Sequence, residues 1–105
     1  MIDNELKVRV RLAAQVALWR QVPPILRAVS VDVDEQKVYF RCICDGVPSE
    51  SEQELLSCAA SELIADFSAP YTIEEEYLQV EFPNPMSHLK FLVFLRYENP
   101  TVLQP

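Results

Sequence analysis

The side chains that could perform chemistry are few and widely spaced along the chain. His88 is the single histidine, and it stands in a proline-rich segment without an evident partner that would make it a general base. Together with Cys42, Cys44 and Cys58 it could form a four-ligand zinc set, but Cys-x-Cys is not a usual zinc-binding spacing. The sequence offers no recognisable nucleophile–base pair and no glycine-rich phosphate loop. We therefore predict a protein that is not an enzyme and that uses no metal or other cofactor.

The cysteines indicate a reducing compartment. Cys42 and Cys44 share the face of a predicted strand with Val38 and Phe40, so we interpret them as buried, reduced thiols. The count of three cysteines is odd, and the first five residues are acidic and polar, unlike a secretory signal. No apolar run approaches the roughly 18 residues that span a membrane. We expect a cytoplasmic protein.

The carboxylates are the most distinctive residues of the chain. No lysine or arginine occurs in the 48 residues from Cys42 to Leu89. The ten acids of this acidic stretch are Asp45, Glu50, Glu52, Glu54, Glu62, Asp66, Glu74, Glu75, Glu76 and Glu81. Both flanking segments carry a net positive charge, so the formal charge of −7 arises entirely in this stretch. Carboxylates without neutralising partners repel each other and cost stability. The pattern therefore indicates either a solubility function or a basic partner, and it argues against binding nucleic acid or anionic membranes.

The three consecutive glutamates at 74–76 could be taken for a metal site. Neighbouring side chains of a strand point to opposite faces, so Glu75 faces away from Glu74 and Glu76. Three ligands cannot converge from such a run alone. We interpret the run as a strand edge that faces solvent or a partner.

The N-terminal half of the chain predicts a helix followed by a hairpin. Residues 4–21 have helical periodicity, with an apolar face that should pack on the rest of the protein. The face consists of Val8, Leu12, Val16 and Trp19, widened by Leu6, Val10, Ala13 and Ala17. Residues 26–34 and 37–45 alternate as strands joined by a short turn. Gly46 is the only glycine, and we expect a left-handed backbone there.

The C-terminal half predicts a second helix and two further strands. The helix covers residues 49–67 and begins with a serine followed three residues later by a glutamate, which is capping-box spacing. An acidic strand covers residues 71–82. A strand that is apolar on both faces covers residues 89–97, and residues 98–105 are expected to form a loose tail.

These elements predict a single domain over residues 1–105 of the α+β class, in the order α-β-β-α-β-β. Two helices should cover one face of a four-stranded, mainly antiparallel sheet. The apolar strand belongs in the centre and the charged strands at the edges. This favours the strand order 1-2-4-3, a circular permutation of the ferredoxin-like arrangement, and the alternative is the meander 1-2-3-4. The uncovered face would display Tyr39, Ile43, Tyr77 and part of the last strand, either as an interface or merely as shielding for the sheet.

Six short segments together form a pattern that resembles a known family. They are Leu26–Asp32, Val38–Arg41, Asp45-Gly46, Ser61–Phe67, Ile73–Glu76 and Phe82-Pro83. The pattern resembles a group of small acidic bacterial proteins, some of which are immunity proteins of contact-dependent growth inhibition and related polymorphic-toxin systems. It covers about residues 12–97. The chain departs from the family at Cys42–Cys44, where the family favours aromatic residues. If those aromatics contact a partner, this chain binds a different one.

The resemblance implies a cytoplasmic immunity protein that binds the C-terminal domain of a cognate toxin and covers its active site. A toxin that cuts nucleic acid must hold phosphates and is therefore basic, so we expect a nuclease to match the acidic stretch. The expected contact residues are the acids and two aromatic anchors: Asp45, Glu50, Glu54, Glu62, Glu74, Glu75, Glu76, Glu81, Tyr39 and Tyr77. The alternative is a housekeeping adaptor or structural domain that forms a homodimer through the open sheet face and has no toxin partner.

Overall fold

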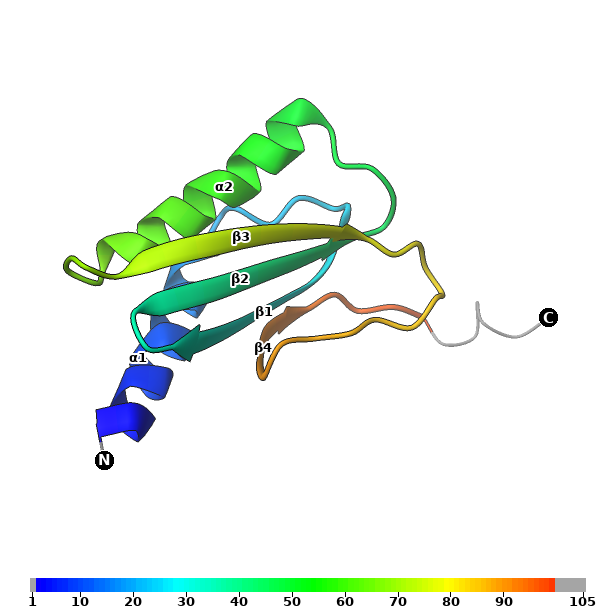
Figure 1. Ribbon diagram of the computed structural model, residues 1–105. Helices are drawn as coiled ribbons and strands as arrows, with labels where there is room; N and C mark the ends of the chain where they lie inside the picture. Colours follow the sequence, from blue (N-terminus) through cyan, green and yellow to red (C-terminus); the bar gives the residue numbers. More distant parts are fainter. Residues whose placement is uncertain (1, 100–105) are drawn as a thin grey trace.

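The computed structural model describes residues 2–99, with side chains from residue 4 onward. The six elements follow the predicted order and form two layers, with both helices on one side of the sheet (Figure 1). They are α1 (Ile2–Ala17), β1 (Leu26–Asp34), β2 (Lys37–Cys44), α2 (Glu50–Ala65), β3 (Thr72–Gln79) and β4 (Phe91–Leu95). Most of the predicted tail, from residue 100, lies outside the described residues. No helix in the described part of the chain is long and apolar enough to cross a membrane.

Local sequence signals set several of the element boundaries. Ser49 Oγ accepts a hydrogen bond from the Glu52 backbone N–H at 3.1 Å, and Glu52 Oε1 accepts one from the Ser49 N–H at 2.8 Å. This is the predicted capping box at the start of α2. Gly46 has φ of 104°, which confirms the predicted left-handed backbone. α1 ends at Ala17, earlier than predicted, and a turn with Arg20 at φ 65° follows.

The strand order is β3-β2-β1-β4, so both predicted orders were wrong. β1 pairs antiparallel with both β2 and β4, as a mainly antiparallel sheet requires. β2 pairs in parallel with β3, which makes the sheet mixed. The parallel pair arises because α2 connects β2 to β3 and returns the chain to the end of the sheet where β2 begins.

β4 lies at an edge although it is apolar on both faces. Phe91 and Phe94 pack against the core on the helix side, whereas Leu92 and Leu95 on the other side are exposed. β1 lies between β2 and β4, and β4 pairs only with the middle part of β1, Ala28–Val31. The charged end of β1 extends beyond that pairing, so its aspartates are compatible with a central strand.

The core lies between the helices and one face of the sheet. Its largest fully buried members include Phe40, Leu56 and Leu63. Cys42 and Cys44 are also fully buried, as predicted, and burial raises the pKa of each thiol. All three cysteines are free thiols, and Cys58 is exposed on α2.

The opposite face of the sheet is not open, contrary to the prediction. Residues 80–90, here called the return segment, lead from β3 back to the start of β4 and lie against this face. The Leu89 N–H donates to Ser30 Oγ at 2.8 Å, and Arg41 Nη1 donates to the Ser87 carbonyl at 2.9 Å. Ile43 and Ser30 are consequently buried. Ile43, expected on display, is therefore part of the protein interior.

The apolar face of α1 is the second correction. The helix buries Val10, Ala14 and Ala17 against the sheet and α2. The four residues predicted to face the core are instead exposed, by 48% for Val8, 58% for Leu12, 50% for Val16 and 69% for Trp19. α1 is apolar on two sides. The side that carries the small alanines is the buried one, because it lets the helix approach the sheet and α2 more closely.

Candidate partner-binding site

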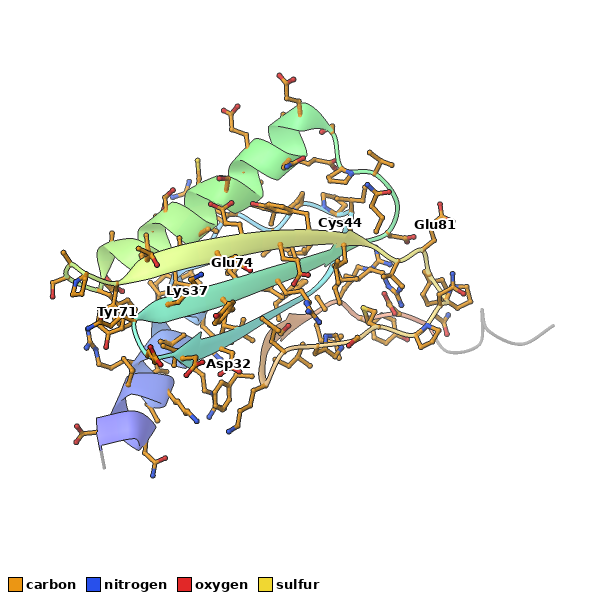
Figure 2. All side chains as sticks on the ribbon, in the orientation of Figure 1. Asp32, Lys37, Cys44, Tyr71, Glu74 and Glu81 are labelled. Carbon is orange, nitrogen blue, oxygen red and sulfur yellow. The ribbon has the colours of Figure 1, made fainter. Side chains whose placement is uncertain are left out.

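The ten residues predicted to contact a partner do not form one patch. Asp45 and Glu81 lie at one end of the sheet. Glu74, Glu75, Glu76, Tyr39 and Tyr77 lie along β2 and β3, and Glu50, Glu54 and Glu62 lie on α2. Figure 2 shows Glu74 and Glu81 well apart, one near the start of β3 and one beyond its end.

The acids of β3 are partly neutralised by cations of the neighbouring strand. Arg41 Nε lies 2.7 Å from Glu76 Oε1, and Lys37 Nζ lies 3.5 Å from Glu74 Oε1. Figure 2 shows Lys37 and Glu74 on adjacent strands. These cations precede the acidic stretch in sequence, but the parallel pairing of β2 with β3 places them beside it. The carboxylates of this edge are therefore less available to a partner than the sequence indicates.

The two predicted aromatic anchors face opposite sides of the sheet. Tyr39 pairs with Glu74 on the side away from the helices, whereas Tyr77 pairs with the buried Cys42 on the helix side. The Tyr77 hydroxyl donates to Glu75 Oε1 at 2.5 Å. Burial, and then this hydrogen bond, raises the pKa of Tyr77. The two tyrosines cannot anchor one partner together.

Asp45 joins three parts of the chain. Its Oδ1 accepts from the Phe82 backbone N–H at 2.9 Å, and its Oδ2 lies 3.0 Å from Arg96 Nη2. The Phe82 N–H, followed by the Arg96 guanidinium, lowers the pKa of Asp45. Its role is to hold the end of β2 to the return segment and to the residue after β4.

A neighbouring ion pair was missed by sequence reasoning. Arg27 is only 2% exposed, and its guanidinium donates to both carboxylate oxygens of Glu98, at 2.7 and 3.0 Å. It also donates to the carbonyls of Val80 at 2.7 Å and Asn84 at 3.0 Å. Glu98, predicted as the first residue of a loose tail, is therefore held in place. An arginine within the apolar first half of β1, Leu26–Val29, was the available signal.

The exposed acids of α2 remain available to a partner, as does Glu81 beyond the end of β3. Glu50, Glu54, Glu62 and the C-cap residue Asp66 are all exposed and recur at multiples of four residues, so they wind across the outer surface of the helix from its start to its end. We call them the acidic ridge. Within the described part of the chain, no salt bridge involves any of their carboxylates. Glu62 accepts a hydrogen bond from the neutral amide of Gln21, at 3.0 Å.

The exposed residues of α1 lie beside this ridge. We call Val8, Leu12, Val16 and Trp19 the apolar stripe. A shallow hollow of about 440 Å³ lies between α1 and the end of α2, and its lining includes Leu12, Val16 and Asp66. Arg9 Nη2 donates to the Asp66 carbonyl at 3.0 Å, which fastens the two helices together. The stripe thus adjoins the ridge at the carboxyl end of α2.

The described residues contain no group of three or more histidine, cysteine or acidic side chains that could hold a metal ion. His88 lies exposed in the return segment, as the sequence predicts for a loop residue.

The chain was compared with known families and proteins. A family model described as MafI2 immunity protein matches residues 7–98, a range that includes most of α1 and every later element of the fold. No curated protein matches the chain.

Proposed function

The chain belongs to the MafI2 immunity protein family, and we propose that it neutralises its cognate toxin by binding a cationic toxin domain. The resemblance to immunity proteins of polymorphic-toxin systems is thereby confirmed. Membership implies an immunity function against a toxin and suggests a non-enzymatic inhibitory role. We further propose that the toxin domain is a nuclease, that the protein covers its active site, and that it acts in the cytoplasm.

The acidic ridge is the observation that supports a cationic partner. Its four carboxylates are exposed and make no salt bridge within the described chain, so they carry an uncompensated negative charge. A nuclease holds the phosphates of its substrate with lysine and arginine side chains. An acidic surface on a rigid helix can occupy the same cationic groups, which would exclude the nucleic acid from the active site.

The test is reconstitution with the toxin domain encoded beside the gene of this protein. We expect the purified toxin domain to degrade DNA or RNA, and an equimolar amount of this protein to suppress the cleavage. The two proteins should elute together as a complex, and co-expression should restore growth of cells that produce the toxin domain. Undiminished cleavage with this protein in excess would refute direct inhibition. A toxin domain that kills cells without cutting nucleic acid would refute the nuclease assignment.

A further inference from the structure

We propose that the toxin binds the helical layer, with the apolar stripe of α1 at the centre of the contact and the acidic ridge of α2 at its rim. This inference rests on the proposed function and names the surface that performs it. The stripe consists of Val8, Leu12, Val16 and Trp19, and the ridge consists of Glu50, Glu54, Glu62 and Asp66.

The fold itself does not use the apolar stripe. α1 attaches to the domain through Val10, Ala14 and Ala17, on the side opposite to the stripe. Four large apolar side chains along three turns remain in solvent. Contiguous exposed apolar patches on soluble proteins mark interaction sites. Tryptophan is among the residues most enriched at the energetic centre of protein interfaces, and Trp19 is the only one in the chain.

The other large surface is a poorer site. The return segment covers the middle of the sheet, where its backbone is hydrogen-bonded to Ser30 and Arg41. A partner that used the carboxylate of Glu76 there would have to compete with the ion pair that it makes with Arg41. The exposed leucines of β4 lie at the far edge of the sheet from β3 and its acids.

The apolar stripe is held beside the part of the acidic ridge at the carboxyl end of α2. Arg9 links α1 to the Asp66 carbonyl, and Gln21 Nε2 links the segment after α1 to Glu62, each at 3.0 Å. An apolar centre beside a charged rim is the usual composition of a specific interface. The ridge supplies the charge complementary to a cationic toxin, and the stripe supplies the apolar area that slows dissociation.

Two arginines of α1 lie at the borders of the apolar stripe. The Arg9 guanidinium lies 4.6 Å from the centre of the Phe67 ring, at the carboxyl end of α2, where the helix dipole favours a cation. The Arg11 guanidinium lies 5.2 Å from the centre of the Phe91 ring, on the β4 side of the helix. Both residues therefore flank the stripe without covering it, although Arg9 also lines the hollow between the stripe and Asp66.

Matched variants test the surface by binding kinetics against the toxin domain. Leu12→Ser is compared with Leu95→Ser, because the two leucines are 58% and 56% exposed. Trp19→Ala is compared with Tyr97→Ala, since Tyr97 is 83% exposed near the other end of the chain. We expect each stripe variant to raise the dissociation rate at least about tenfold and each control to change it less than about twofold. All four side chains are exposed, and thermal melts confirm folding before binding is measured.

A charge-reversal pair tests the rim. Glu54→Lys should slow association more than Glu74→Lys, because Glu74 is already paired with Lys37 and lies on β3. Circular dichroism of both variants excludes a folding defect as the cause of a difference.

The outcomes separate this inference from the proposed function. Tight toxin binding that survives the Leu12 and Trp19 substitutions overturns the inference and leaves the proposed function standing. Loss of binding in the Leu95 or Tyr97 controls alone assigns the site to the sheet side and also overturns it. If Leu12→Ser converts a dimer to a monomer in light scattering without changing toxin affinity, the stripe belongs to a second copy of the chain. A wild-type protein that does not bind the toxin domain overturns both conclusions.

Discussion

At the scale of single residues, Arg27 connects distant parts of the chain. Its guanidinium binds the Glu98 carboxylate and the carbonyls of Val80 and Asn84 while almost fully buried. Arg27→Met should lower the free energy of unfolding by about 1.5–3 kcal/mol, because the Glu98 carboxylate keeps only Arg96, at 3.1 Å, and the Val80 and Asn84 carbonyls lose their charged donor. Urea denaturation measures this, and the exposed Arg20→Met is the control. A loss no larger than that of the control would show that the ion pair contributes little.

The same cluster predicts the response to acid. The Arg27 hydrogen bond lowers the pKa of Glu98 below its ordinary 4.5, and the Phe82 N–H lowers that of Asp45 below its ordinary 3.8. A folded-state pKa below the unfolded value gives stability that is complete above the unfolded value and is lost as the pH falls through the folded one. Unfolding free energy should therefore decrease as the pH falls below about 4.5.

The Glu98→Gln variant checks this assignment. It should be less stable than the wild type at neutral pH, and its stability should fall less between pH 5 and pH 3, which spans the ordinary carboxyl range. Urea unfolding across the pH series measures both effects. An identical acid dependence in the variant and the wild type would place the responsible carboxyl elsewhere.

The cysteines give a second prediction at the residue scale. Thiolates are the reactive species, and burial raises the pKa of the Cys42 and Cys44 thiols. Cys58 is exposed. Titration with a thiol reagent should therefore modify one thiol in the native protein and three after denaturation. Rapid modification of all three in the native state would contradict the burial of the first two.

At the scale of elements, the capping box of α2 contributes measurable stability. Ser49→Ala removes the acceptor for the Glu52 N–H, and the loss of such a cap costs about 1 kcal/mol. Ser61→Ala, at an exposed position of the same helix, is the matched control and should be nearly neutral. Denaturant unfolding of the two variants distinguishes them. Equal stability of the two variants would mean that water satisfies the Glu52 N–H as well as Ser49 Oγ does.

The elements were largely predictable because their signals are local. Helix periodicity, the capping box, the hairpin turn and the single glycine each act within a few residues, and each is found where expected. The positions of β4 and of the α1 surface were not predictable in the same way. An apolar strand can be central or lie at an edge beside a helix, and a helix with two apolar sides can bury either one.

At the scale of the whole molecule, the charge distribution predicts how the partner is reached. Exposed charges act over a Debye length of about 8 Å at physiological salt, and they influence encounter more than dissociation. The association rate with the toxin domain should fall steeply with ionic strength while the dissociation rate changes little. Surface binding kinetics at several salt concentrations measure both rates.

Charge reversal identifies the responsible carboxylates. Glu50→Lys combined with Glu54→Lys should reduce the salt dependence of association, because both belong to the acidic ridge. Asp34→Lys, at the end of β1, should have a smaller effect. An association rate that ignores both salt and the double reversal would show that the ridge serves solubility alone.

The sequence by itself determined the order and type of the elements, the acidic stretch and the resemblance that the MafI2 match confirms. These depend on local periodicity, composition and short motifs. Only the tertiary structure decided the strand order, the pairing of Lys37 and Arg41 with the β3 acids, and the exposure of Leu12 and Trp19. Those features depend on contacts between residues far apart in sequence and on how closely side chains of different size allow the layers to approach. A local sequence pattern contains no information about either.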